Sequence, residues 1–483
     1  MINDIAQSVS SLVTNILENT NTLVREVRRD SMHVARESEA LYRGASEQVA
    51  GLRSTVRATP RFAKIVREGI RIVASYRIHR AKAGLLTPEA AAVELEQLHA
   101  TNAKRLHDLC VDLRGGVLKL GQFLSCRMDL LPDAYVKELS ALQDRVPAID
   151  TAQITAVIEE ELGRPIDELF AEFDQEALAA ASLAQVHRAR LPSGEAVAVK
   201  VQVPGIEQII EIDLAAMRVL GNIFRELVPR VDMATISTEL ARSIREELDY
   251  ELEAANATAF AENFAKRDDI IVPAIIGDYS SKRVLTMELV DGVRMTDYLD
   301  EANQEDTNEL FSQLISSYCQ EVLEHGLLHA DPHPGNFLVA EGPRLVILDF
   351  GSVQRYTPEE RKAYAELAGA LLAGNAEKIA ELLQKVGFRT ATGDSAEIVE
   401  FAEMMLDAFR ADAAFDFASL DPKKELEKAL ELARKNPVVS VPNEFVMLGR
   451  VFGAISGLLL HYKPQVNMFA LISPALAAAL SAT

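Results

Sequence analysis

The sequence contains few cysteines and no long apolar run, and both absences exclude a class of protein. Only three cysteines occur among 483 residues, Cys110, Cys126 and Cys319, and no two of them form a C-x-x-C pair. A disulfide scaffold and a cysteine-based zinc site are therefore excluded, and a reducing compartment fits best.

No run of about 18 uncharged apolar residues occurs, so we expect no transmembrane helix. The best candidate, Val446–Leu460, is interrupted by Arg450, and the apolar tail Leu471–Leu480 is too short. The N-terminal segment lacks the apolar centre of a secretory signal, and Asp4 and Glu18 argue against a transit peptide.

Positive charge is scarce outside the N-terminal part of the chain. The net charge is −22, but residues 1–86 hold 14 Lys+Arg against 8 Asp+Glu, a net of +6, and the remainder holds 36 against 64, a net of −28. The acidic body argues against a nucleic-acid partner. The basic part could contact anionic membrane lipids, or it could be a solvated helical arm.

Residues 61–82 show a basic amphipathic helix pattern. Such a helix could lie on a membrane surface, or it could pack against the protein's own acidic body. One face carries Phe62, Ile65, Val66, Val73 and Tyr76, and the other carries Arg61, Lys64, Arg67 and Arg71.

Four regions follow from the periodicity and the turn signals. Residues 1–86 form a basic helical extension, 87–173 a helical region that begins at the N-cap Thr87, 174–292 a small mixed lobe, and 293–483 a mainly helical lobe. The expected fold class is therefore α+β. The expected strands are Ala181–Arg190, Glu195–Gln202, Ile270–Ile276, Val284–Leu289, Phe337–Val339 and Leu345–Leu348, and helices are expected at about 204–227 and 236–265.

The motif HADPHPGNF at 329–337, followed by LVILDFG at 345–351, carries the strongest chemical signal. It matches the order and spacing of the kinase set H-x-D-x-x-x-x-N and D-F-G. Asn336 and Asp349 supply hard oxygen ligands for Mg²⁺, and Asp331 would orient or deprotonate an attacking hydroxyl or water. His329 and His333 could suggest a metal site, but loop-stabilising hydrogen bonds are the favoured interpretation.

A lysine that contacts the ATP phosphates is predicted at Lys200, where the strand Ala196–Lys200 reads A-V-A-V-K. Strand alternation places Val197 and Val199 on one face and Lys200 on the other. Its carboxylate partner should lie on a following helix, where five acids are candidates: Glu246, Glu247, Asp249, Glu251 and Glu253.

A glycine-rich phosphate loop is missing, and Ala179, Ala180, Ala181 and Ser182 occupy its place. Alanine stays close to the backbone but does not share the conformational freedom of glycine. We therefore expect nucleotide binding with an altered phosphate geometry, although Ala179–Ala181 could also be a packing patch.

These motifs resemble those of the UbiB-type atypical kinases, also called AarF-domain or ADCK-type proteins, over roughly residues 90–470. The matching segments are KLGQ at Lys119–Gln122 with SCRMDLLP, LQDRVP at 142–147, AAASLAQVH, VAVKVQVPG, ELDYELEAAN, HADPHPGN and DFG.

The resemblance implies a protein-kinase-like bilobal fold and assigns roles to further residues. The KxGQ helix would cover the nucleotide site with Lys119 and Gln122, and Lys119 would pair with Glu247 and Asp249. Glu253 would be the partner of Lys200, and Glu288 and Val290 are assigned to nucleotide binding.

Two departures from ordinary protein kinases argue against phosphorylation of proteins in trans. Ala330 replaces the arginine of H-R-D, and only Ser352–Tyr356 separates Gly351 from a helix start at Thr357. Hydrolysis of ATP, or transfer to a small or lipid-like acceptor, stays open.

The resemblance also implies a setting and partners. The predicted function is an ATP- and Mg²⁺-dependent atypical kinase or ATPase that supports ubiquinone or related lipid metabolism. We expect a cytoplasmic protein, peripheral on the inner face of a membrane, with ATP/ADP as ligands. Anionic lipids, quinone-biosynthesis enzymes and a second copy in a homodimer are further candidate partners. A nucleotide-gated scaffold and a small-molecule phosphotransferase are the alternatives.

Overall fold

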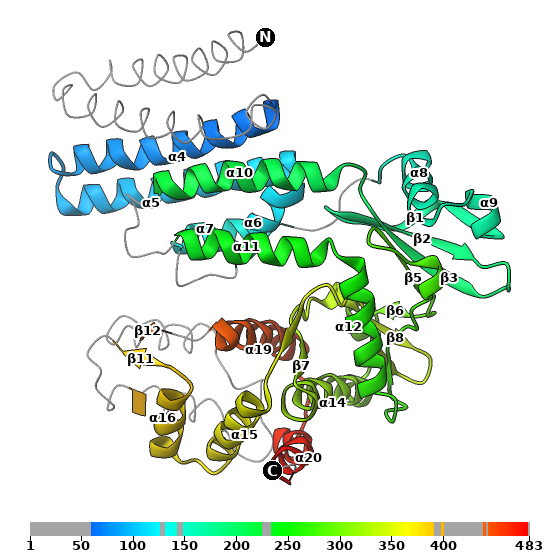
Figure 1. Cartoon of the computed structure of the whole chain (residues 1–483). Coiled ribbons are helices and arrows are strands. Elements are labelled where there is room, and N and C mark those ends of the chain that lie inside the picture. The colour runs from blue at the N-terminus through cyan, green and yellow to red at the C-terminus, as the bar shows by residue number, and fades with distance from the viewer. Residues whose placement is uncertain are drawn as a thin grey trace. The chain divides into compact units, whose positions relative to one another are not determined.

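A computed structural model of the chain describes residues 59–125, 131–142, 148–224, 233–390, 398–399, 438–440 and 443–481 (Figure 1). Cys126 and positions 143–147 of the LQDRVP motif lie outside the described residues. The chain divides into two compact units. The first comprises Met1–Ala189 and Val199–Leu248, and the second comprises Arg190–Ala198 and Asp249–Thr483.

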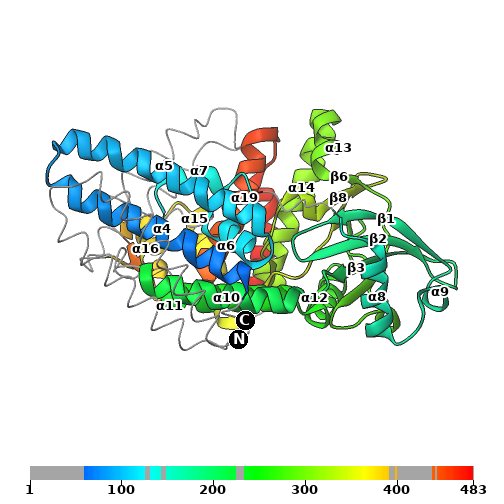
Figure 2. The same cartoon turned by 90° about the horizontal axis from the view of Figure 1, so that it is seen from above.

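The first unit is mainly helical, and along its described residues the strands come after six helices and before two more (Figures 1 and 2). Its elements are α4 (Pro60–Ala83), α5 (Pro88–Leu113), α6 (Gly115–Ser125), α7 (Asp133–Leu139), α8 (Thr151–Leu162), α9 (Ile166–Leu169), β1 (Glu172–Ala180), β2 (Ala184–Arg190), β3 (Ala196–Gln202), α10 (Ile206–Phe224) and α11 (Met233–Glu247). The last residue of β2 and the first three of β3 go with the second unit.

Helix α4 lies along α5 and α10 in both views (Figures 1 and 2). Thr59 caps its N-terminus by accepting a hydrogen bond from the backbone N–H of Phe62, and Pro60 occupies the first helical position, where no N–H is needed. The apolar face predicted from the sequence is buried in the core of this unit. Gly69 allows a close approach to α10, since a Cβ there would lie 2.3 Å from Leu220 Cδ2. Packing against the protein itself therefore accounts for the apolar face of α4.

A buried ion pair ties α4 to α10 and to the corner between α5 and α6. Arg61 Nε and Nη2 each donate to Asp213 at 2.6 Å. The same guanidinium donates to the carbonyls of Leu113 at 2.6 Å and Arg114 at 2.9 Å. Asp213 also accepts from Val117 N at 3.3 Å, so it caps the start of α6. Burial raises the pKa of Asp213, and Arg61 acts in the opposite direction.

The strands β1, β2 and β3 belong to a four-stranded sheet of order β1-β2-β3-β5, where β5 is Val284–Glu288. The division of the chain runs through this sheet, because Arg190–Ala198 goes with the second unit. β1 was not expected, and the strand expected from Ala181 begins at Ala184 instead. The helix expected at 236–265 is interrupted at Leu248–Asp249, where Asp249 caps a new helix.

The second unit contains short strands and the remaining helices. Its elements are α12 (Tyr250–Asn263), β4 (Ile270–Ile271), the 3₁₀ turn η1 (Gly277–Tyr279), β5, β6 (Val293–Arg294), α13 (Met295–Glu301), α14 (Gln304–Gln320), the π turn η2 (Glu321–His325), β7 (Leu327–His329), the 3₁₀ turn η3 (Pro334–Asn336), β8 (Phe337–Ala340), β9 (Arg344–Ile347), β10 (Val353–Arg355), α15 (Pro358–Leu372), α16 (Ala376–Lys385), β11 (Arg389–Thr390), β12 (Val438–Ser440), α19 (Asn443–Tyr462) and α20 (Met468–Ser481).

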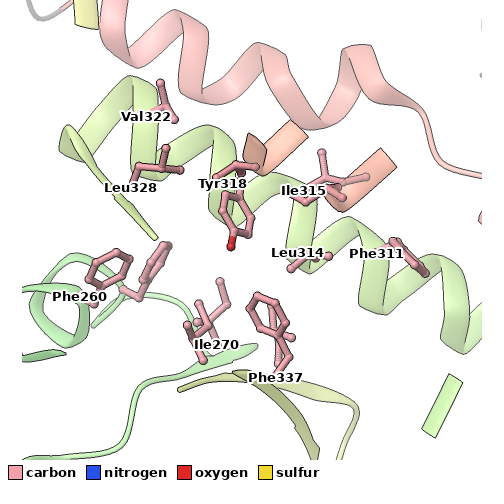
Figure 3. Close-up of a cluster of buried hydrophobic side chains, with 14 of the residues drawn as sticks. Phe260, Ile270, Phe311, Leu314, Ile315, Tyr318, Val322, Leu328 and Phe337 are labelled. Atoms are coloured by element: carbon pink, nitrogen blue, oxygen red, sulfur yellow. The ribbon is translucent and has the colours of Figure 1, made fainter. Parts of the chain in front are cut away.

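Helix α14 forms the centre of the core of the second unit. Leu314 and Tyr318 of this helix point toward Ile270 of β4 and Phe337 of β8 (Figure 3), and Phe311 and Ile315 belong to the same buried core. β4, β9, β8 and β6 form a second sheet, in this order. Its residue Phe337 is fully buried at the start of β8, immediately after the HADPHPGN motif.

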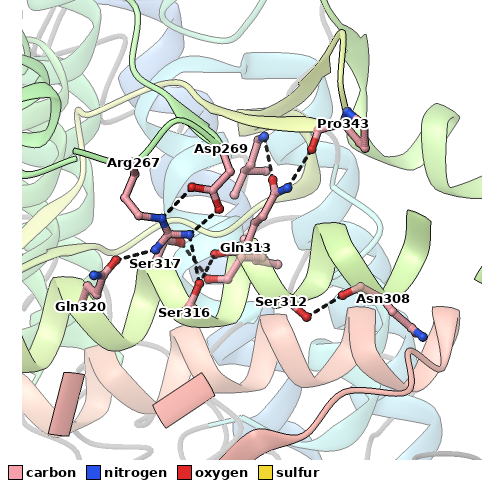
Figure 4. Close-up of polar contacts among 11 residues, drawn as sticks. Arg267, Asp269, Asn308, Ser312, Gln313, Ser316, Ser317, Gln320 and Pro343 are labelled. Carbon is pink, nitrogen blue, oxygen red and sulfur yellow. Dashed lines mark hydrogen bonds and ion pairs between the residues drawn. The ribbon is translucent and has the colours of Figure 1, made fainter. Parts of the chain in front are cut away.

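Polar contacts fix β9 to α14 (Figure 4). Gln313 on α14 donates to the carbonyl of Pro343 at 2.8 Å and accepts from Leu345 N at 3.0 Å. Arg267 forms two hydrogen bonds with Asp269, of 2.7 and 2.6 Å, and the carbonyl of Asp269 accepts from Leu345 N at 2.9 Å. These bonds set the register of the strand that leads to Asp349.

Among the described residues, no helix is both long enough and apolar enough to cross a bilayer. Pro474 lies inside the most apolar helix, α20, which has 14 residues.

We expect Arg61→Ala to destabilise the first unit more than Asp213→Ala does. The Asp213 side chain has no exposed surface, whereas 18% of the Arg61 side chain is exposed. When its partner is removed, only the arginine can therefore be solvated by water. A buried charge without its partner costs about 3–5 kcal/mol. Denaturant unfolding at neutral pH measures the difference.

The matched control is Lys64→Ala on the same helix, because Lys64 pairs with Asp112 at the surface and exposed pairs contribute at most about 1 kcal/mol. The loss of unfolding free energy in Arg61→Ala should become smaller as the pH falls. Without Arg61, the buried Asp213 binds a proton at a higher pH in the folded protein than in the unfolded chain, and it is then neutral. Equal losses for the lysine and arginine variants would contradict the proposed role of the buried pair.

Candidate active site

The loop after β7 holds Asp331 and Asn336 together. Asn336 Nδ2 donates to the Asp331 carbonyl at 3.0 Å and to Asp331 Oδ2 at 3.1 Å. The backbone carbonyl of Asn336 accepts from Leu348 N at 2.8 Å, which links this loop to the end of β9. His333 stabilises the same loop as an N-cap, because its Nδ1 accepts from Gly335 N at 3.1 Å.

Asp349 has a backbone conformation that is rare for a residue with a side chain. Its φ is +58°, in the left-handed region, and non-glycine residues in sparsely populated regions cost about 1–3 kcal/mol. His329 Nε2 donates to the carbonyls of Leu348 at 3.1 Å and Asp349 at 2.8 Å. Asp349 Oδ1 accepts from Gly351 N at 3.2 Å. The surrounding hydrogen bonds therefore fix a strained residue at the predicted metal site.

A buried polar cluster lies behind His329. Because Nε2 faces carbonyl oxygens, it must carry the proton, and Nδ1 can then accept from Tyr318 Oη, 3.4 Å away. The backbone N–H of His329 donates to Glu321 Oε2 at 2.8 Å. Glu321 is buried in the π turn η2, and this burial raises the pKa of its carboxyl well above the ordinary range. His329 thus acts through hydrogen bonds, which agrees with the interpretation favoured from the sequence.

Helix α12 contributes two buried polar side chains to the second unit, Glu253 and Asn256. Asn256 Nδ2 donates to the carbonyl of Phe350 at 3.1 Å, and its Oδ1 accepts from Arg355 Nη2 at 2.9 Å. The Phe350 ring is buried with its centroid 4.9 Å from that of Phe260. α12 therefore holds the D-F-G segment through contacts separate from the hydrogen bonds of the HADPHPGN loop.

The segment after Gly351 is short and paired. β10 lies antiparallel to β7 with Val353 opposite His329, and Ala330 N donates to the carbonyl of Ser352 at 2.9 Å. Thr357 then caps α15 with a capping box completed by Glu360, as the helix signal at this position predicted.

Residues assigned to nucleotide binding in the second unit lie at the end of β5. Glu288 N donates to the carbonyl of Ala274 at 2.8 Å, and Leu289 N donates to the carbonyl of Ala196 at 3.1 Å. Val290 follows directly. Their assignment to nucleotide binding stays a prediction.

In the first unit, Lys200 lies on β3 and the alanine-rich segment precedes β2. Val197 and Val199 are fully buried, as the predicted alternation requires. Ala179 and Ala180 end β1, and Ala181 begins the turn, in which its N–H donates to the carbonyl of Ala184 at 2.8 Å. Ser182 in this turn is buried.

Gln185 and His187, directly after this turn, attach it to the chain before α8. Gln185 accepts from Ile149 N at 3.0 Å and donates to the Ile149 carbonyl at 3.4 Å. Its Nε2 lies 2.8 Å from His187 Nε2, and His187 Nδ1 lies 2.8 Å from the carbonyl of Asp174. Because a carbonyl only accepts, His187 Nδ1 carries the proton and Nε2 accepts from Gln185.

Helix α6 presents Lys119 and Gln122 within the first unit. Lys119 Nζ lies 2.7 Å from Glu247 Oε1 at the end of α11. Asp249, the other predicted partner, caps α12 by accepting from Leu252 N at 3.1 Å. Gly121 lets α6 approach its neighbours, since a Cβ there would lie 2.5 Å from Leu142 Cδ1 and 2.8 Å from Cys110 Sγ.

The predicted site residues thus form two groups. Lys119, Gln122, Lys200, Glu247 and the alanine-rich segment belong to the first unit, and Asp249, Glu253, Glu288, Val290, Asp331, Asn336 and Asp349 belong to the second. The predicted pairing of Lys200 with Glu253, like a shared nucleotide pocket, joins residues of both units and stays a prediction.

Asn336 and Asp349 fit a magnesium site of the kind that is completed by ligand phosphates. Both amide-nitrogen bonds of Asn336 go to Asp331, so its amide oxygen is the atom left to face a cation. Among the described residues, no cluster of three or more His, Cys, Asp or Glu side chains could hold a metal. Mg²⁺ commonly uses only one or two protein ligands together with phosphates and waters, so two ligands suffice.

Several residues that support the site were not expected from the sequence. Asp213 and Arg61 are 152 positions apart, and Glu321 and Asn256 look like ordinary polar residues of helices. No pattern in the sequence singles out these acids, since Asp213 follows Glu211 closely in α10 and Glu321 comes between Gln320 and Glu324.

Comparison with known proteins places these features in a family context. A family model described as the ABC1 atypical kinase-like domain matches residues 141–383. The chain is 37% identical over 345 residues to the chloroplastic protein ACTIVITY OF BC1 COMPLEX KINASE 8 of Arabidopsis thaliana, which covers 70% of this chain and 45% of that protein. It is 36% identical over 310 residues to AarF domain-containing protein kinase 1 of Xenopus laevis, which covers 62% of this chain and 59% of that protein. The chain therefore spans about half the length of these curated relatives.

A solved structure is also similar. It is described as the complex of Rv3197 with erythromycin from Mycobacterium tuberculosis. The TM-score is 0.59 at 25% sequence identity, and the match covers 81% of this chain and 99% of that chain.

We expect Gly121→Ala to destabilise the protein by about 1–3 kcal/mol, the usual cost of adding a methyl group to a tightly packed core. Cys110→Ala should recover part of this loss, because it removes Sγ, one of the two atoms that the new Cβ would meet. Thermal unfolding of both variants measures the effect.

The control is Gly453→Ala in α19, where a Cβ would meet nothing within 4 Å. Alanine is the better helix former by about 1 kcal/mol, so this variant should be neutral or more stable. A Gly121→Ala variant as stable as Gly453→Ala would show that α6 is not closely packed.

Proposed function

The chain belongs to the ABC1 atypical kinase-like domain family, and from this premise we propose that it is an ATP- and Mg²⁺-dependent enzyme of the phosphoryl-transfer type. The acceptor would be water or a small or lipid-like molecule. The observation that carries this proposal is the joint fixation of Asp331, Asn336 and Asp349 by one network of hydrogen bonds in the second unit.

Each of these residues has a role that follows from its chemistry. Asp331, held by Asn336, would orient the attacking hydroxyl or water through its carboxylate. Asn336 and Asp349 would hold Mg²⁺, which neutralises charge on the phosphates when bound. His329 is a positioning residue that fixes the backbone of Asp349.

The groups of the first unit would complete the site. Lys200 would contact the α- and β-phosphates, with Glu253 as its partner. The turn around Ala181 and Ser182 would cover the phosphates, and Lys119 and Gln122 would restrict access of an acceptor. These assignments are proposals that rest on the family resemblance.

The short segment after Gly351 supports a non-protein acceptor. In protein kinases the corresponding segment docks the substrate peptide and carries a phosphosite. Here Val353 is already paired with His329 of β7, the Ser352 carbonyl accepts from Ala330 N, and α15 begins at Pro358. This leaves little backbone for docking a substrate peptide. We therefore propose lipid or quinone metabolism as the setting of the reaction.

Contact with a membrane would use the turn between α4 and α5 and not the face of α4. The apolar face is buried in the first unit, whereas Leu85 and Leu86 in that turn are 72% and 38% exposed. Arg80 and Lys82 lie in the last turn of α4 beside them. Exposed leucines next to basic residues suit an anionic lipid surface.

We expect the purified protein to hydrolyse ATP in the presence of Mg²⁺ and to lose activity with EDTA. Asp349→Asn should lower turnover by about 100-fold or more, since it weakens electrostatic stabilisation of the transferred phosphoryl group. Turnover is measured as phosphate release. The assay is run without additions and then with liposomes, with quinone-precursor-like phenols, or with erythromycin.

The control is Asp278→Asn, an exposed aspartate of η1 in the same unit. Absence of wild-type turnover together with retained ATP binding would favour a nucleotide-gated scaffold. Turnover that Asp349→Asn leaves intact would refute the assignment of this residue.

We expect the full chain to sediment with vesicles that contain phosphatidylserine and less with neutral vesicles. Leu85→Ser combined with Leu86→Ser should reduce this binding, because each CH₂ group that no longer enters the membrane removes about 0.8 kcal/mol of binding free energy. Leu178→Ser, at a leucine of β1 that is 46% exposed, is the control. Equal sedimentation of the two variants would rule out the turn as the contact.

A further inference from the structure

Strand β3 carries a second polar residue on the same side as Lys200. Strand side chains alternate, so Gln202, two positions on, shares the side of Lys200. Gln202 is only 1% exposed. Its Nε2 donates to the backbone carbonyl of Leu248 at 2.6 Å in a fully buried hydrogen bond.

The carbonyl that Gln202 binds lies where α11 ends. Glu247 is the last residue of α11, and the final carbonyls of a helix have no partner within the helix. Leu248 N donates to the carbonyl of Ile244 at 3.2 Å, and the Leu248 side chain is buried. Leu248 is therefore fixed through its N–H, its side chain and, by Gln202, its carbonyl.

Glu247, the residue before Leu248, forms the ion pair with Lys119 of α6. Gln202 holds the carbonyl of the Leu248–Asp249 peptide, and Leu248 is bonded directly to Glu247, so the position of the Glu247 backbone depends on how Leu248 is held. Neither partner is deeply buried, since 20% of the Lys119 side chain and 30% of the Glu247 side chain are exposed. Such a pair is weak unless its geometry is imposed by the surrounding backbone.

We propose that Gln202 is a positioning residue that keeps Glu247 against Lys119 and so connects the strand of the nucleotide lysine to the KxGQ helix. Both bonds lie within the first unit, and one strand carries both Lys200 and Gln202. A displacement of β3 would reach Lys119 through Leu248 and Glu247. The consequence for catalysis rests on the proposed function, whereas the positioning itself does not.

The chemistry of the position favours an amide. Leucine of similar size would leave the Leu248 carbonyl buried without this donor, and glutamate would place a carboxylate against the carbonyl oxygen. Asparagine keeps the amide but is one methylene shorter.

The direct test is the reactivity of the Lys119 amine in the full-length protein. Brief labelling with acetic anhydride followed by mass spectrometry measures the rate at each lysine. In Gln202→Leu, the rate at Lys119 should rise by up to about fivefold, the factor equivalent to loss of an exposed ion pair of about 1 kcal/mol. Gln202→Asn should act in the same direction, and this variant also covers the case in which the leucine variant fails to fold.

Gln208→Leu is the matched control, because Gln208 is an exposed glutamine of α10 in the same unit. Glu247→Gln should raise the Lys119 rate on its own, and adding Gln202→Leu should then have no further effect. An unchanged Lys119 rate in both Gln202 variants would overturn the proposal. An equal rise in the presence and absence of Glu247→Gln would also overturn it, since the effect would then be a general loosening of the fold.

ATP turnover separates this inference from the proposed function. Gln202→Leu should change turnover in the wild-type background but not in a Lys119→Met background. If the wild type hydrolyses no ATP, the proposed enzyme is refuted, and the labelling result still decides the role of Gln202.

Discussion

The predicted metal and catalytic residues of the second unit depend on the left-handed backbone of Asp349. A residue with a side chain does not adopt this conformation without compensation. His329 supplies it by donating to the carbonyls of Leu348 and Asp349, one on each side of the Asp349 Cα, and Asn256 holds the carbonyl of Phe350. Glu321 in turn fixes His329 by accepting from its backbone N–H. This buried acid, which the sequence did not single out, therefore helps to determine the direction of Asp349, the predicted metal ligand.

Helix α6 in the first unit is restrained at three separate points. Asp213 caps its start with the help of Arg61, Gly121 brings its middle against Cys110, and Glu247 pairs with Lys119. The first restraint is buried and strong, whereas the last is half-exposed and weak. Any rearrangement of Lys119 can therefore occur by side-chain release, without unpacking of the helix that carries it. The buried apolar face of α4 belongs to the same assembly, because Arg61 is its first charged residue.

The sequence allowed the chemical motifs to be recognised because their order and spacing depend on local backbone geometry. Asp331, Asn336 and Asp349 are close in the chain, and the α+β kinase-like fold follows from the family that these motifs define. Short strands such as β7 and β10 have three residues each, too few for a period-two pattern. The break at Leu248–Asp249 has no glycine or proline to mark it. Periodicity identified the apolar face of α4 but not what covers it, since the covering residues come from other helices, among them α5 and the more distant α10.

The division of the chain has a consequence for its synthesis. Since Arg190–Ala198 goes with the second unit while the segments on either side go with the first, neither unit is one continuous stretch of the chain. During translation, the first unit can close only after Leu248 has emerged from the ribosome. The start of β3 cannot pair with β5, its neighbour in the sheet, until the residues of β5 have also been synthesised. An unpaired strand edge would then be exposed on the nascent chain, which is a state that chaperones recognise.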